Sequence, residues 1–107
     1  MFVAMNHFRV QPDQGEAFEQ VWRERESFLQ EVPGFVQFAL LRGDDDAYIS
    51  HSIWESRQAF EAWANSEAFT RGHRGGGSMG EILAGHPEVK LWESVIVEEG
   101  VVAAAGD

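Results

Sequence analysis

The stretch "FVQFALLRGDDDAYISHSIW", residues Phe35–Trp54, decides the fold because two strand-like runs flank one short polar turn. "FVQFALLR" (35–42) and "AYISHSIW" (47–54) are rich in the β-branched and aromatic residues that favour strands. "GDDD" (43–46) joins them and is typical of a turn. The stretch therefore predicts two antiparallel strands paired as a hairpin.

Strand-like and helical runs continue on both sides of this hairpin. "FVAMNHFRV" (2–10) is predicted as a first strand, and "EVKLWESVIVE" (88–98) as a last one. An apolar stripe at helical spacing predicts a helix between residues 12 and 32, which ends at Pro33–Gly34. In this helix Asp13 is the predicted N-cap and Glu16 its capping-box partner.

A second helix is predicted from Ser56 to His73, and the glycine-rich segment 74–87 is predicted as a loop. The order of elements is then strand, helix, strand, strand, helix, strand, which is the α+β, ferredoxin-like βαββαβ pattern. Helices on one side leave the other face of such a sheet bare. Because the strands are apolar on both faces, a symmetric homodimer that forms an α/β barrel is expected to cover it. The apolar residues assigned to these faces are Val3, Met5, Val89, Leu91, Val95 and Val97.

The composition limits the classes of function. The chain has 107 residues, which suits one domain, predicted over 1–98 with a flexible tail over 99–107. Its formal net charge of -10 argues against nucleic acids and anionic membranes as partners. The chain has no cysteine, which excludes disulfides and thiolate chemistry. A cytoplasmic location is expected, since the start resembles no signal peptide and no apolar run approaches a membrane span.

Trp63 and His73 are the first candidate site residues. In an unbroken helix, ten positions place them about 15 Å apart along the axis and on different faces. Asn65–Ser66 is a weak helical pair, and a break there gives two short helices that meet at an angle. Trp63 and Phe69 then line one apolar pocket with His73 at its rim. The alternative is that the aromatic residues are core and His73 is solvated.

Asn6 is the second candidate, because it lies in an otherwise apolar row of the first strand. Phe2, Ala4, Asn6 and Phe8 share one face by the two-residue period of a strand. A buried amide without partners costs about 2 kcal/mol or more. Asn6 therefore either bonds to neighbouring backbone or faces a ligand cavity.

Other polar residues carry weaker signals. Arg71 and Arg74 flank His73 and either meet acid groups of a ligand or are solvated. The histidines show no metal-ligand spacing, and the glycine-rich segment lacks the ending of a phosphate-binding loop. Trp22, within the charged run "WRERES", is by pattern more typical of a core.

The run "WESRQAFEAWANSEAF" (54–69) resembles the antibiotic biosynthesis monooxygenase superfamily of dimeric ferredoxin-like barrels, and the resemblance covers about residues 1–98. A narrower resemblance is to the haem-degrading monooxygenases of the iron-regulated surface determinant G type. An asparagine on the first strand, a tryptophan on the second helical region and a histidine about ten positions later define their site. Asn6, Trp63 and His73 match these positions, and Trp22 stands where that family has a phenylalanine.

This resemblance implies a haem oxygenase activity that opens the porphyrin with O2 and electrons from a reductase, and releases iron. Haem is then substrate and oxygen activator at once. His73 is implied as the axial iron ligand, Asn6 as an amide donor toward the iron-bound ligand, and Trp63 as the group that buckles the macrocycle. Two alternatives remain: a cofactor-independent monooxygenase that forms a quinone from an aromatic polyketide, and a non-catalytic haem-binding module. Further predicted haem contacts are Trp22, from the resemblance, and Phe69, Arg71 and Arg74, from their positions near His73.

Overall fold

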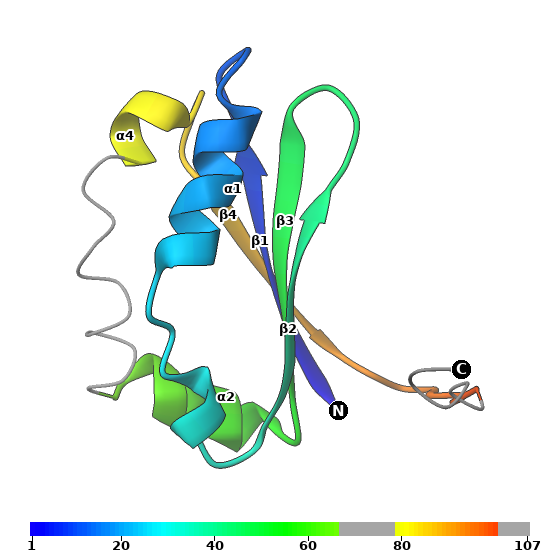
Figure 1. Ribbon diagram of the computed structural model, residues 1–107. Coiled ribbons are helices and arrows are strands. Elements are labelled where there is room, and N and C mark those ends of the chain that lie inside the picture. The colour runs from blue at the N-terminus through cyan, green and yellow to red at the C-terminus, as the bar shows by residue number, and fades with distance from the viewer. Residues whose placement is uncertain (67–78, 101–107) are drawn as a thin grey trace, which may run out of the picture.

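The computed structural model describes residues 1–66 and 79–100, and shows one antiparallel sheet with its helices on one side (Figure 1). The strands pair in the order β2-β3-β1-β4, so β1 is central beside β3. The predicted ferredoxin-like order of elements is confirmed. The strands are β1 (Phe2–Arg9), β2 (Phe35–Arg42), β3 (Ala47–Trp54) and β4 (Glu88–Glu93).

The hairpin β2–β3 has the predicted bounds. Its turn is closed by the amide of Gly43, which donates to the carbonyl of Ala47 at 2.8 Å. Asp45 and Asp46 take left-handed backbone angles, with φ of 56° and 63°. Aspartate tolerates this region better than most residues, which is why "GDDD" can make the turn.

The helices cover one face of the sheet and leave the other, called here the outer face, without a covering layer in the described parts of the chain (Figure 1). Along β1, Phe2, Ala4, Phe8 and the following Val10 are buried on the helix side, while alternate residues are partly or fully exposed. The helical elements are α1 (Gly15–Glu24), the 3₁₀ helix η1 (Leu29–Glu31), α2 (Arg57–Ala64) and α4 (Met79–Ile82).

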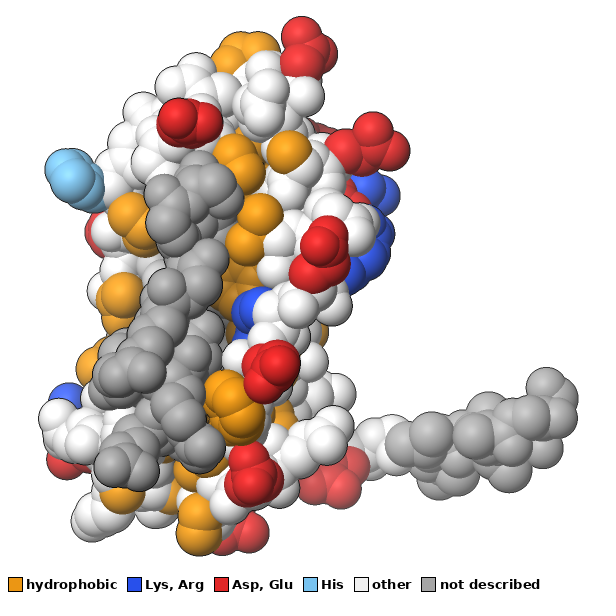
Figure 2. Space-filling model, turned by 60° about the vertical axis from the view of Figure 1, so that its left-hand side comes forward, with side chains coloured by type: hydrophobic (Ala, Val, Ile, Leu, Met, Phe, Trp, Pro, Cys, Tyr) orange, Lys and Arg blue, Asp and Glu red, His pale blue; other side chains and the backbone are white. Residues whose placement is uncertain are grey.

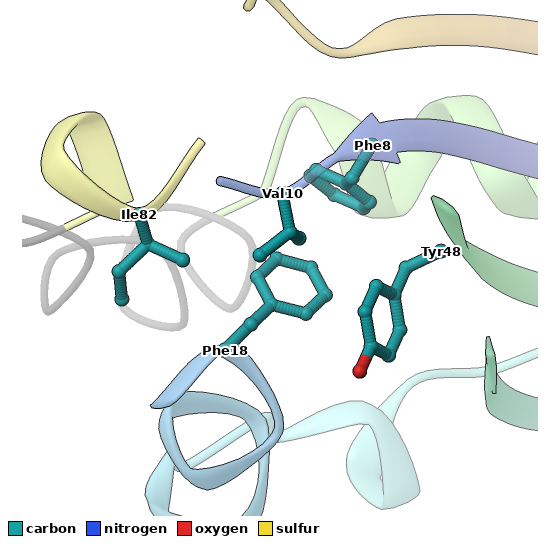
Figure 3. Close-up of a cluster of buried hydrophobic side chains, with 5 residues drawn as sticks. All are labelled: Phe8, Val10, Phe18, Tyr48 and Ile82. Atoms are coloured by element: carbon teal, nitrogen blue, oxygen red, sulfur yellow. The ribbon is translucent and has the colours of Figure 1, made fainter. Parts of the chain in front are cut away.

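One core cluster lies where α1 and α4 meet the sheet (Figure 3). Phe18 of α1 is completely buried, and its ring centroid lies 5.2 Å from that of Phe8 and 4.7 Å from that of Tyr48. The Tyr48 hydroxyl donates to Glu19 Oε2 at 2.6 Å, which lowers the pKa of that carboxyl. Burial in turn raises the pKa of Tyr48. We call this group, made by Phe8, Val10, Phe18, Tyr48 and Ile82, the α1 cluster.

A second core cluster lies under α2 and is built on the indole of Trp54. Trp54 is fully buried, and its Nε1 donates to the hydroxyl of Ser52 at 3.0 Å. Its ring contacts Phe60 and Trp63 of α2, at centroid distances of 5.8 and 5.1 Å. We call this group the α2 cluster; its buried members are Phe2, Leu29 and Trp54.

The first helix differs from its prediction at both ends. Its N-cap is Gln14, which makes no side-chain capping bond, and Asp13 takes a left-handed φ of 68°. The predicted capping box of Asp13 and Glu16 is therefore wrong. The helix also ends at Glu24 rather than at residue 32, because the chain turns extended at the next residue and becomes left-handed at Phe28. This path buries Leu29 in the α2 cluster, which a continuous helix does not do.

The last strand and the glycine-rich segment also differ from their predictions. β4 ends at Glu93 rather than at residue 98, and just beyond it the Ser94 amide donates to the Met1 carbonyl at 2.8 Å. The chain after β4 leaves the sheet (Figure 1). Residues 79–82, predicted as loop, form the short α4, whose Ile82 is buried in the α1 cluster. Within the described residues, no helix has the length and apolarity needed to cross a membrane.

Candidate functional site

Helix α2 is fixed at its start by local hydrogen bonds and by one close backbone approach. The Ser56 hydroxyl accepts from the Ala59 amide at 3.1 Å, which caps the helix. Arg57 and Glu61 pair one turn apart, Nε to Oε1, at 2.9 Å. Gly34, with φ of 83°, lies so close that a Cβ on it would come within 2.5 Å of the Ala59 Cβ. The loop before β2 therefore packs directly on the helix.

The end of α2 matches the predicted break at Asn65–Ser66. The helix ends at Ala64, and the Asn65 side-chain amide donates to the Glu61 carbonyl at 2.9 Å. The Ser66 hydroxyl donates to the Trp63 carbonyl at 2.6 Å. Both side chains thus satisfy carbonyls that a longer helix would pair internally, which explains why the helix stops here.

Trp63, the first site candidate, lies in the last turn of α2 and is half-buried. Its ring centroid is 5.1 Å from that of Trp54, with a tilt of 33°, and 6.1 Å from that of Phe60. Trp54 is in turn held by its bond to Ser52. The indole of Trp63 therefore rests on a rigid support on the helix side of the sheet.

Asn6, the second candidate, lies in the middle of β1 on the same side of the sheet. Its Oδ1 is buried and accepts no hydrogen bond from the described residues. Ser50 of β3 is its direct neighbour on one side and Val89 of β4 on the other. One of the two predicted roles of Asn6 is a hydrogen bond to neighbouring backbone. The structure shows no such bond to Oδ1 within the described residues.

Small, polar or exposed side chains cover the sheet between the two core clusters. On β1, Phe2 belongs to the α2 cluster and Phe8 to the α1 cluster, whereas the helix-side residues between them belong to neither. In Figure 2, hydrophobic side chains gather along the middle of the molecule, with Lys or Arg atoms among them. We call the residues between the clusters the central floor: Ala4, Asn6, Ser50, Ser52, Val89 and Leu91.

The register of β4 corrects one prediction about the faces. Val89 pairs with Asn6 and Leu91 pairs with Ala4, so both side chains point to the helix side. The sequence pattern instead predicts both residues on the sheet face that a partner covers. They are 59% and 41% exposed, which leaves apolar surface next to Asn6.

Trp22 and Arg25 form the edge of this region at the end of α1. Trp22 stacks on Phe38 of β2, with centroids 5.5 Å apart and a 21° tilt, and touches Phe8 edge-on at 5.7 Å. The Arg25 guanidinium lies over both flat rings, 4.8 Å from the centroid of Trp22 and 4.6 Å from that of Phe38. Two aromatic faces thus hold one cation.

Arg25 is a functional candidate that the sequence analysis missed. Its Nε is buried without a hydrogen-bond partner, and none of the ion pairs within the described residues includes it. Burial lowers the pKa of the guanidinium, since desolvation disfavours the charged form. In the sequence, Arg25 is one of several charges in "WRERES", and only the early end of α1 turns it inward. A half-buried cation of this kind is suited to an anionic group of a ligand.

Three candidates, Asn6, Trp63 and Trp22, thus share the helix side of the sheet. An open cleft of about 550 Å³ includes Trp63, and another of about 720 Å³ includes Trp22. The remaining candidates, Phe69, Arg71, His73 and Arg74, lie outside the described residues. Among residues 1–66 and 79–100, no three His, Asp or Glu side chains gather into a metal site.

Known proteins resemble this chain in sequence and in structure. Over 76 residues, 67% of this chain and 72% of the relative, it is 36% identical to "Heme oxygenase (mycobilin-producing)" of Mycobacterium tuberculosis strain H37Rv. The structure of the heme-degrader MhuD from Mycobacterium tuberculosis, with two hemes bound in its active site, superposes with a TM-score of 0.76 at 29% identity, over 92% of this chain and all of that one.

A more distant structure shows the same fold. A Nitrosomonas europaea protein, described as an antibiotic biosynthesis monooxygenase, superposes with a TM-score of 0.70 at 16% identity, over 90% of this chain and all of that one. The family model for "Antibiotic biosynthesis monooxygenase" matches residues 1–75. With its ferredoxin-like sheet and a match over most of its length, this chain belongs to the antibiotic biosynthesis monooxygenase family.

Proposed function

We propose that this protein is a haem-degrading monooxygenase, which binds haem over the central floor and opens the porphyrin with O2 and electrons from a reductase. The observation that carries the proposal is the side-chain amide of Asn6, whose oxygen is buried without a partner among the described residues, in a floor that lies between two aromatic clusters. The likeness to a mycobilin-producing heme oxygenase and to the heme-bound MhuD structure supports it.

The described residues fit haem as a flat, apolar, dianionic substrate. Trp22, Trp63 and the exposed parts of Val89 and Leu91 offer apolar surface to a macrocycle. Arg25 offers a half-buried positive charge to a haem carboxylate. This local charge matters because the chain as a whole carries a net charge of -10 and repels anions at longer range.

Each residue of the proposed site has a distinct role. His73 is the proposed axial ligand of the haem iron, a role that rests on the family resemblance. Asn6 directs an amide N–H toward the ligand on the iron. Trp63, supported from below by Trp54, presses on the macrocycle and holds it distorted. Haem itself supplies the iron that activates O2. The further proposed contacts are Trp22, Phe69, Arg71 and Arg74.

A haemin titration tests the proposal. We expect a roughly stoichiometric complex with a Soret band of a histidine-ligated haem, and loss of that band in His73→Ala. With ascorbate or a reductase, and with catalase present to remove free peroxide, we expect the band to decay as iron is released. If no complex forms, the proposal is wrong and the quinone-forming alternative takes its place. A complex that persists under reductant identifies a haem-binding module instead.

We also propose that a second copy of this chain covers the outer face. Apolar side chains point away from the helices on three neighbouring strands, among them Met5 on β1 and Ile49 on β3. On β4, Trp92 is 52% exposed next to Val3. Apolar side chains on three adjacent strands give a surface that is suited to a stable protein interface.

Met5→Asp is expected to convert a dimer into a monomer of about 12.0 kDa. A charge at the centre of the outer face is costly when desolvated in an interface but is tolerated when it faces water. Sedimentation velocity measures the mass, and circular dichroism verifies the fold. Gln30→Glu is the matched control, since Gln30 is exposed on η1, away from this face. A monomeric wild-type protein contradicts the proposal.

A further inference from the structure

The orientation of the Asn6 amide decides what it can do. A primary amide has an acceptor end, Oδ1, and a donor end, Nδ2, and only the donor end can bond to an oxygen or a lone pair of a ligand. The two ends have nearly the same shape, so packing alone does not fix which one faces the ligand. In the structure, Oδ1 is the buried end and has no partner among the described residues. A hydrogen-bond donor beside Oδ1 would fix the orientation.

Ser50 is the neighbour that can supply this donor. It lies directly opposite Asn6 in the β1–β3 ladder, and its side chain points to the same side of the sheet. Opposite residues in such a ladder have Cβ atoms about 4.5–5.5 Å apart, within reach of a hydroxyl and an amide. On β4, the residue opposite Asn6 is Val89, which has no side-chain donor. Ser50 makes no side-chain hydrogen bond with the other described residues, whereas Ser52 is bonded to Trp54.

We propose that Ser50 is a positioning residue. In the structure its hydroxyl and Asn6 Oδ1 belong to neighbouring residues and are not bonded to each other; a rotation of these side chains lets the hydroxyl donate to Oδ1, which turns Nδ2 toward the ligand above the central floor. This inference rests on the proposed haem site and deepens it. It makes the polar element of the floor a hydroxyl–amide pair rather than a single amide. The pair satisfies the buried oxygen of Asn6 and leaves both N–H groups of the amide for the ligand.

The C–O stretch of carbon monoxide bound to ferrous haem reports on Nδ2, because an N–H donor near the bound CO lowers its frequency. We expect Ser50→Ala to raise the frequency toward the value in Asn6→Ala and to broaden the band. In the Asn6→Ala background, Ser50→Ala should cause no further shift, since its effect passes through the amide. Ser50→Thr keeps the hydroxyl and should restore the wild-type band. Ser94→Ala, the same substitution just after β4 and outside the central floor, is the control and should leave it unchanged.

Nuclear magnetic resonance of the haem-free protein tests the contact independently of haem. The side-chain NH₂ signals of Asn6 should move in Ser50→Ala and stay in place in Ser94→Ala. If haem binds but the C–O stretch has the same frequency in the wild type and in Ser50→Ala, the inference is wrong while the proposed function stands. If haem does not bind, the proposed function is wrong, and the NH₂ signals still decide whether Ser50 holds Asn6.

Discussion

Asn6→Ala is expected to slow haem turnover by on the order of 10²-fold, with little change in haem affinity. The amide contributes an N–H where charge develops on the iron-bound ligand, but it adds little contact to the macrocycle itself. Single-turnover decay of the Soret band under reductant measures the rate, and titration measures the affinity. The fold should tolerate the change, because it removes a buried oxygen that has no partner among the described residues.

Asn6→Asp separates the donor from the shape of the side chain. It keeps the size and an acceptor oxygen but cannot donate when ionised. We expect its turnover to be at least as slow as that of Asn6→Ala, because a negative charge then faces the reacting ligand. Wild-type turnover in either variant would show that the amide is not part of the catalytic machinery.

The hairpin and α2 are predictable because short-range chemistry fixes both of them. The turn 43–46 needs residues that tolerate positive φ at positions 45 and 46, and the sequence provides an aspartate at each of them. Ser56 caps α2, and Asn65 and Ser66 end it with their own side chains. Each of these signals lies within four residues of the boundary that it sets.

The first helix is less predictable because tertiary packing ends it. The apolar stripe continues to Val32 at helical spacing, but the last part of it is used by the α2 cluster, at the other end of the sheet. The chain leaves the helix after Glu24 to reach that cluster. The same departure turns Arg25 inward over two aromatic rings. The local sequence pattern predicts neither the end of the helix nor the inward position of Arg25, because both depend on contacts with a distant strand.

The faces of β4 show a second limit of the sequence. Both rows of this strand contain apolar residues, so alternation alone does not say which row meets the helices. The pairing of Asn6 with Val89 decides it, and a shift by one residue would reverse every assignment. Asn6 itself is identifiable from the sequence, as the one amide in an apolar row, whereas its neighbour Ser50 becomes visible only with the register.

Arg25→Met is expected to weaken haem binding by about 10- to 100-fold while the haem-free protein keeps its stability or gains some. A hydrogen bond to a charged group contributes about 1.5–3 kcal/mol, which the complex loses. The haem-free protein, in contrast, loses a desolvated cation without an ion-pair partner in the described chain. Methionine retains the contact with Trp22 and Phe38. Haemin titration and urea unfolding measure the two quantities.

Arg23→Met is the matched control because it removes the same charge from the exposed side of α1. The Arg23 side chain is 64% exposed and pairs with Glu19, so its loss should change affinity little and stability slightly.

A haem whose carboxylates are esterified provides the second control, since it has no anion for Arg25 to bind. Wild type and Arg25→Met should bind this ester with equal affinity. If the wild type binds the ester much more tightly than Arg25→Met does, Arg25 acts on the macrocycle, through stacking, and not on its carboxylates. If Arg25→Met loses as much free energy of unfolding as free energy of haem binding, the guanidinium belongs to the core instead, where it supports Trp22 and Phe38.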